Sequence, residues 1–267
     1  MNGLKLVIMR TLFLLVLVLP LTCGLARADT VLYGTDPSAY PETTAQLNSM
    51  FPHGYTESTA GLFDVTGSGT TQFTIKYASQ DGAYNFSVGY FIYNGTLPSN
   101  TASASSLESW AYNTVAGGKE LFDERTSSPG ATATINLPAG SVIGFYLIPN
   151  DTLADFLANG KNYNPFTSSA WPLFSIAGAN PNSSDQAMVF SSGTSAMGNN
   201  GVLLSWEDML RLTPNSQSDS DFNDLILTAN CLQPVPEPST YALASAGLLA
   251  LLLAGYRIRQ HKKSKHV

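Results

Sequence analysis

The chain has 267 residues, of which 44% are hydrophobic and only 12% are charged. Soluble domains carry about 25% charged residues, and disordered chains combine high charge with few apolar residues, so this composition argues against disorder. The net charge of −6 argues against nucleic acid as a partner, because phosphate binding needs clustered Lys and Arg, and the two cysteines exclude a disulfide-dense scaffold.

The first 28 residues are organised as an export signal. Two basic residues precede the apolar stretch Thr11–Thr22, which is shorter than the roughly 20 residues of a membrane span. Ala26 and Ala28 then form the A-x-A pattern of a signal cleavage site, so we predict export and removal of residues 1–28. A lipoprotein anchor at Cys23 is the alternative, but Thr22 stands where such an anchor has Gly or Ala.

Residues 29–231 are predicted to form one domain that is large enough for a core of its own. Between Asp29 and Val235 the chain carries 18 acidic and five basic residues, a net charge of −13. Thr, Val, Ile, Tyr and Phe recur there, and Gly, Asn, Ser and Pro separate them. This pattern favours a mainly β fold, a single antiparallel β-sandwich of jelly-roll-like type with one or two short helices.

The clearest strand is 71–77, where polar and apolar residues alternate so that Phe73, Ile75 and Tyr77 are expected to point inward. Asp81-Gly82 is typical of a tight turn, and a strand at 84–93 is expected to return from it as a hairpin. Further strands are predicted at 133–137, 141–148 (with a bulge at Gly144), 187–191, 202–206 and 222–229.

Two segments favour helices. One lies within 107–122, where Gly117-Gly118 interrupts the pattern. The other, 151–159, is predicted to be capped by Asp151 and closed by Gly160.

An acidic cluster lies near the end of the domain. The predicted strands 202–206 and 222–229 would pair as a hairpin and bring its carboxylates together, where like charges repel. Calcium would reverse that repulsion, because it binds six to eight carboxylate, amide and carbonyl oxygens. The expected ligands are Glu207, Asp208, Asp219, Asp221, Asn223 and Asp224. The spacing is not that of an EF-hand, and the alternative is a solvated acidic loop without an ion.

The same stretch resembles a known family. Trp206-Glu207-Asp208 and Asp221-Phe222-Asn223-Asp224-Leu225 look like the C-terminal motif of an uncharacterised β-rich domain family of secreted and surface bacterial proteins. The run Gly144–Pro149 is similar to a strand of that family. The resemblance implies an extracellular, calcium-stabilised module with no established enzymatic role.

The C-terminal end has three parts in tight order. Residues 232–239 are predicted as a Pro-rich linker that contains Pro236-Glu237-Pro238, and 240–267 hold an uncharged run and a basic tail. A plain transmembrane anchor with cytoplasmic basic residues is one interpretation. The order also resembles the PEP-CTERM sorting signal of Gram-negative bacteria, which a membrane protease-transpeptidase called exosortase recognises and removes. The resemblance implies transient membrane insertion and delivery to the cell surface or extracellular matrix.

Three functions are compatible with these features. The first is a non-catalytic surface or matrix protein in an exopolysaccharide or biofilm context. The second is a carbohydrate-binding module, with Trp110, Trp171 and Trp206 as candidates for stacking on extracellular polysaccharide. The third, a glycan-acting enzyme, needs two carboxylates that face each other in a cleft. Standard catalytic motifs are absent from the sequence, and His53, the one histidine outside the end segments, is expected on the surface, so we expect no catalysis.

Overall fold

The computed structural model describes residues 41–58, 60–82, 84–95, 97–98, 104–165, 167–209 and 221–235. All of these belong to one compact unit, Arg27–Glu237. Several predicted features lie outside the described residues, namely Ala26 and Ala28, the expected ligand Asp219, the motif Pro236-Glu237-Pro238 and the segment 240–267. No helix within the described residues is long and apolar enough to cross a membrane.

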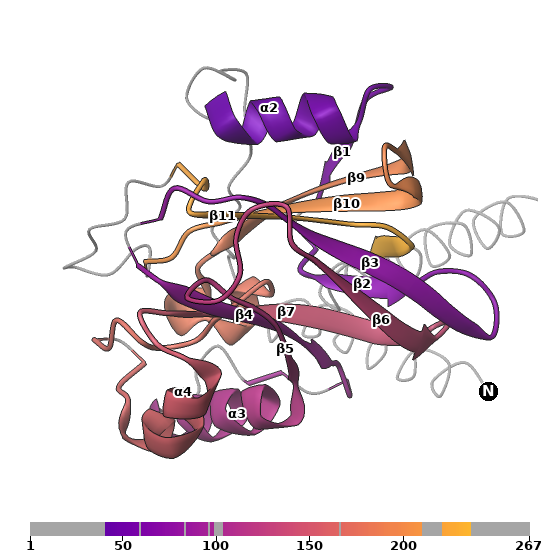
Figure 1. Cartoon of the computed structure of the whole chain (residues 1–267). Coiled ribbons are helices and arrows are strands. Elements are labelled where there is room, and N and C mark those ends of the chain that lie inside the picture. The colour runs from indigo at the N-terminus through magenta and orange to yellow at the C-terminus, as the bar shows by residue number, and fades with distance from the viewer. Residues whose placement is uncertain are drawn as a thin grey trace, which may run out of the picture. The chain divides into compact units, whose positions relative to one another are not determined.

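Two antiparallel sheets pack against each other as a β-sandwich, which confirms the predicted fold class (Figure 1). The first sheet has the strand order β1 (Thr56–Ser58), β9 (Ala187–Ser195), β10 (Gly198–Trp206), β11 (Leu225–Ala229), β3 (Thr70–Ser79) and β6 (Thr132–Pro138). The second has the order β12 (Leu232–Val235), β2 (Leu62–Val65), β7 (Val142–Pro149), β4 (Phe86–Ile92) and β5 (Lys119–Asp123), and β8 (Leu173–Phe174) pairs with β7.

The main core lies between the two sheets. Phe73, Ile75 and Tyr77 of β3 point into it and are 1%, 0% and 0% exposed, as the alternation predicts. Tyr77 meets Phe86 of the opposite sheet edge to face, with ring centroids 5.7 Å apart. Such aromatic pairs combine a large buried area with a preferred geometry, so they fix how the two sheets lie on each other.

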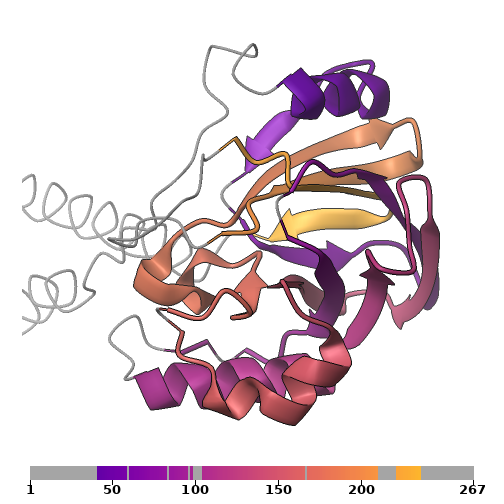
Figure 2. The same cartoon turned by 60° about the vertical axis from the view of Figure 1, so that its left-hand side comes forward.

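Helices cover the outer faces of both sheets. The helix α2 (Pro41–Met50) lies over the first sheet, whereas α3 (Ala104–Gly117) and α4 (Leu153–Asn159) lie under the second (Figures 1 and 2). Beneath α2 is a second, smaller core formed by Leu47, Met50, Phe51, Met188, Phe190, Leu203, Phe222 and Ile226. The predicted helix within 107–122 corresponds to α3. This helix ends at Gly117, the first residue of the Gly117-Gly118 pair.

The predicted cap of the second helix is wrong by one residue. Thr152, not Asp151, is the N-cap of α4, and its Oγ1 accepts a hydrogen bond of 3.0 Å from the Asp155 amide. The Asp151 carboxylate is engaged elsewhere, because it accepts bonds from the Thr152 amide (2.9 Å) and from the Tyr163 hydroxyl (2.7 Å). Gly160 follows the helix as predicted.

The predicted hairpin at Asp81-Gly82 does not form. Strand β3 pairs with β11 and β6, whereas β4 pairs with β7 and β5 in the other sheet. The chain therefore crosses from one sheet to the other between Ser79 and Phe86. Turn chemistry indicates where the chain reverses but not which strand it returns to, and here pairing with distant strands decides.

Two further expectations need correction. Gly144 is no bulge, because its register on β7 is regular on both sides, and a Cβ there would lie 2.5 Å from the Phe91 ring. The fold also continues past 231 into the predicted linker, where β12 pairs with β2. Pro234 has no amide hydrogen to donate, and it is accommodated because β12 is an edge strand.

Candidate metal site

The acidic residues meet at one end of the first sheet because of how β10 and β11 pair. These strands are antiparallel, and their last register pair is Trp206 with Leu225. Glu207 and Asp208 therefore leave β10 at the point where Asp224 enters β11. This is the arrangement that the sequence predicts for a hairpin that joins the two acidic segments.

Three carboxylates come together there. One oxygen each of Glu207, Asp208 and Asp224 can be chosen so that all three lie within 4.8 Å of one another. The three residues are 1%, 1% and 7% exposed. We call them the acidic triad. Carboxylates are rarely buried without compensation, because burial disfavours the charged form.

Backbone amides orient two members of the triad. The Asp208 amide donates to Asp224 Oδ2 at 2.6 Å, and the Tyr84 amide donates to Asp208 Oδ2 at 3.0 Å. Each bond uses one oxygen of a carboxylate that has two. Main-chain groups therefore hold Asp208 and Asp224 in place, and the second bond comes from the segment that crosses between the sheets.

The crossover segment lies directly against the triad. A Cβ added at Gly82 would lie 2.7 Å from Asp208 Oδ2 and 3.2 Å from the Asp224 carbonyl oxygen. A Cβ atom essentially never lies within 3.0 Å of another heavy atom, so a side chain at this position would push the crossover segment away from Asp208. The sequence marks Asp81-Gly82 as a turn but does not indicate this approach.

The remaining predicted ligands are placed less closely. Asp221 and Asn223 are half-buried, and the Asn223 amide donates to Asp221 Oδ1 at 3.2 Å, which turns the chain ahead of Asp224. Asp221 is not a member of the triad, and Asp219 lies outside the described residues. Of the six expected ligands, the structure thus brings three together.

Phe222 sets the direction of this loop. It has a φ of 53°, in the left-handed region that costs a non-glycine residue roughly 1–2 kcal/mol. Its ring is fully buried in the second core beneath α2, and its carbonyl oxygen accepts hydrogen bonds from the Ser205 and Thr43 hydroxyls. This left-handed backbone conformation lets the Phe222 ring enter the core under α2 while the chain continues to Asp224.

Sequence reasoning missed one acidic residue at this sheet end. Asp185 precedes β9 and is 8% exposed, and the carbonyl of its neighbour Gln186 accepts a 3.0 Å bond from the Glu207 amide. The pairing of β9 with β10 therefore continues past Ala187 and places Asp185 near the end of β10. A single Asp far upstream in sequence gives no signal of this placement.

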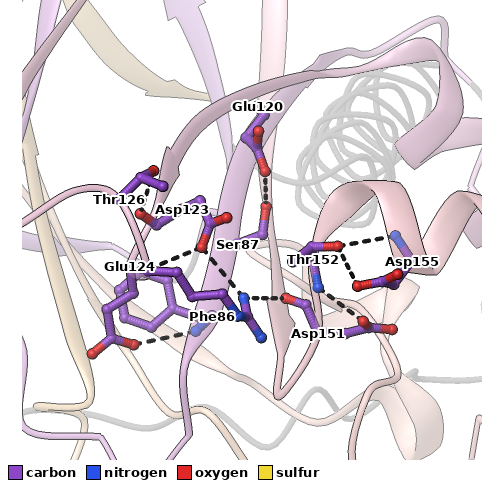
Figure 3. Close-up of polar contacts among 10 residues, drawn as sticks. Phe86, Ser87, Glu120, Asp123, Glu124, Thr126, Asp151, Thr152 and Asp155 are labelled. Atoms are coloured by element: carbon purple, nitrogen blue, oxygen red, sulfur yellow. Dashed lines mark hydrogen bonds and ion pairs between the residues drawn. The ribbon is translucent and has the colours of Figure 1, made fainter.

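A second acidic group, on β5 and around α4, is arranged differently (Figure 3). Glu120 accepts a bond from the Ser87 hydroxyl, Glu124 accepts one from the Phe86 amide at 3.2 Å, and Asp123 forms an ion pair with Arg125 at 3.3 Å. Burial raises the pKa of Glu124, although the Phe86 amide and Arg125 oppose that shift. This group forms no cluster of three ligand atoms among the described residues.

The tryptophans do not form an exposed platform. Trp171 and Trp206 are 1% and 0% exposed. Trp110 is half-buried and packs on Phe174 with ring centroids 5.0 Å apart. His53 is exposed, as expected. Stacking on a sugar requires an accessible ring face, so the three tryptophans do not favour a carbohydrate site.

The fold and the triad define the chain as an acidic β-sandwich with buried carboxylates at one sheet end. Residues 137–231 match a family described as a domain of unknown function (DUF4114), and residues 234–259 match the PEP-CTERM protein-sorting motif. No curated protein matches the chain.

The two matches agree with the two resemblances found in the sequence, one to a sorting signal and one to an uncharacterised domain family. The PEP-CTERM match means that the protein is exported and that an exosortase sorts it to the membrane-anchored cell surface of a Gram-negative bacterium. The first match includes Trp206–Asp208 and Asp221–Leu225, and that these segments are the motif of that family stays a prediction.

Proposed function

We propose that the exported domain is a non-catalytic surface module of the extracellular matrix, in an exopolysaccharide or biofilm context, and that a calcium ion bound at the acidic triad closes one end of its sandwich. The observation that supports the ion is the burial of Glu207, Asp208 and Asp224 with ligand oxygens within 4.8 Å of one another. Export and exosortase sorting follow from the PEP-CTERM match.

Electrostatics supports a bound cation. Two like charges about 5 Å apart repel by about 3 kcal/mol at an effective dielectric constant of about 20. Three buried carboxylates therefore oppose folding as long as all are ionised and no cation neutralises them. A divalent ion changes repulsion into attraction and would link the end of β10, the start of β11 and, through Asp208, the crossover segment.

Ligand chemistry favours calcium over other metals. The triad offers only oxygen, and Asp221 and Asn223 carry further carboxylate and amide oxygens close by in the chain, which suits the six to eight oxygens of calcium. Magnesium keeps several waters and uses few protein ligands, and zinc prefers His and Cys. Carboxylates that are 1–7% exposed also favour an ion over a sugar ring as the ligand.

Thermal melting tests the site. The fragment 29–237, which includes β12, is melted with excess calcium and with a chelator. At one hundred times Kd, the ion should add about 2.7 kcal/mol to the free energy of unfolding. For a domain of this size each kcal/mol corresponds to about 2–4 °C, so the melting temperature should rise by about 5–10 °C.

Variants separate a specific site from general charge screening. Asp224→Ala removes a triad member and should abolish the calcium-dependent rise, and Asp221→Ala tests whether the neighbouring carboxylate also binds. Asp155→Asn changes an exposed carboxylate of the second acidic group and should keep the full rise. Equal melting temperatures with calcium and with chelator would contradict the proposal.

A further inference from the structure

Strand β12 continues directly into the sorting motif. Val235 is the last residue of β12, and Pro236 is the first residue of the Pro-Glu-Pro triplet. Only residues 236–240 separate Val235 from the uncharged run that begins at Tyr241. Five residues span at most about 18 Å when fully extended. The eight-residue linker expected from the sequence is thus shortened by the four residues of a strand.

Strand β12 is hydrogen-bonded along one edge only, and it also packs against β10 of the other sheet. It lies at the edge of the second sheet and pairs with β2 alone. Leu232 is its one fully buried residue, whereas Gln233 is exposed and Pro234 and Val235 are half-buried. Pro234 also donates no ladder hydrogen bond. A four-residue edge strand with one fully buried side chain, and with Val235 only partly buried against the core, is among the elements that open at low free energy.

The chain is fixed immediately before β12. The Asn230 side chain accepts a 2.7 Å bond from the Thr74 amide and donates one of 3.1 Å to the Met197 carbonyl. Cys231 has a φ of 55°, and its amide and carbonyl bond to Asn199 and Thr66. The direction of the chain changes at Cys231, so β12 can leave β2 while β11 and the acidic triad stay in place.

We propose that β12 detaches from β2 before exosortase processing and serves as the spacer between the folded domain and the membrane enzyme. A peptide that is recognised by strand addition is bound in extended form through its main-chain groups, and a detached β12 could be presented to the enzyme in this form. A detached β12 adds four residues, or about 13 Å, to the accessible chain. With β12 in place, the folded domain ends at Val235, directly before the Pro-Glu-Pro triplet that the enzyme must bind.

A disulfide across β12 and β2 tests the proposal in cells that contain the exosortase. Gln233 pairs with Asp64 in the antiparallel register, where Cα separations of about 4.5–5.5 Å suit a disulfide. In the full chain, Asp64→Cys with Gln233→Cys should oxidise after export and leave most of the protein as unprocessed precursor. Three control variants keep Cys231: the double variant Asp64→Ser with Gln233→Ser, and each of the two single Cys variants. All three should be processed like the wild type.

An inserted spacer distinguishes the spacing effect from misfolding. A flexible stretch of six Gly and Ser residues between Val235 and Pro236 should restore processing of the disulfide variant and leave the wild type unaffected. Normal processing of the oxidised variant without the insertion, or no rescue by the insertion, would overturn the proposal. Neither outcome depends on calcium, so this test is independent of the proposed ion.

Discussion

At the residue scale, the triad makes a prediction whose sign depends on calcium. Glu207→Gln keeps the shape of a side chain that is 1% exposed and removes one of three clustered charges. In chelator the variant should melt at a higher temperature than the wild type, because repulsion falls. In saturating calcium it should melt at a lower temperature, because a ligand is lost. Calorimetry of both proteins in both buffers measures the four melting temperatures. If the same protein melts higher in both buffers, the proposed calcium site is contradicted.

A second prediction at this scale concerns Tyr146. Its hydroxyl is buried and has no hydrogen-bond partner among the described residues, and burial raises its pKa. The unfolded chain therefore loses this proton first, near pH 10, and the free energy of unfolding should fall as the pH rises above about 10. Tyr146→Phe should be nearly neutral at pH 7 and should reduce the loss above pH 10. Urea titrations at pH 7 and pH 10.5 measure both effects, and equal slopes with pH would argue against this account.

Tyr163 is the matched control for Tyr146. Its hydroxyl donates to Asp151 at 2.7 Å, and this bond, with burial, raises the pKa of Tyr163 to about 12. Tyr163→Phe should therefore cost about 1.5–3 kcal/mol already at pH 7, because a hydrogen bond to a carboxylate is lost. Both pKa values are raised, so neither hydroxyl is ionised at pH 7, and the difference between the two variants at that pH reports the lost bond alone.

How far the site could be predicted depends on the distance in sequence between its residues. Glu207, Asp208 and Asp224 lie in one acidic stretch, and two flanking apolar runs predict that this stretch folds back on itself. Gly82 comes against these residues through the crossover, and β9 brings Asp185 to the same end of the sheet. Their position depends on sheet register, which alternation within one segment does not encode.

At the element scale, the crossover makes a third prediction. Gly82→Ala would place a Cβ 2.7 Å from Asp208 Oδ2, so the crossover should shift and the Tyr84 amide should lose its bond to Asp208. The variant should lower the free energy of unfolding by about 1–3 kcal/mol and weaken the rise of melting temperature with calcium. Gly193→Ala is the control, since a Cβ there has no neighbour within 4 Å. Equal calcium responses of the two variants would contradict the role of the crossover.

Strands β3 and β7 show why the positions of strands were easier to predict than their pairing partners. Alternation in β3 identifies a half-buried strand correctly, and the apolar run of β7 identifies a fully buried one. The partners of β3 are β11 and β6, which are distant in sequence. Loop entropy favours the local hairpin, but the larger apolar contact between two complete sheets outweighs it.

At the scale of the whole molecule, the family match covers only part of an interleaved fold. Residues 137–231 extend from the end of β6 to just past β11, and β1 to β5 lie outside them. Yet β7 lies between β2 and β4, and β11 lies between β10 and β3. The matched segment therefore shares both sheets with the preceding part of the chain.

This interleaving gives a fourth prediction, that the fragment 137–231 does not fold alone. Without β2, β3 and β4, one edge of β11 loses its partner and β7 keeps only the two-residue strand β8, although β7 is buried at almost every residue. Unpaired apolar edges promote aggregation, and β7 with the two residues of β8 is too small a sheet to cover β9, β10 and β11. The fragment should bind a hydrophobic dye and melt without a cooperative transition, whereas 29–237 should melt cooperatively. A sharp transition in 137–231 alone would mean that the matched segment carries a complete core, contrary to the strand order of both sheets.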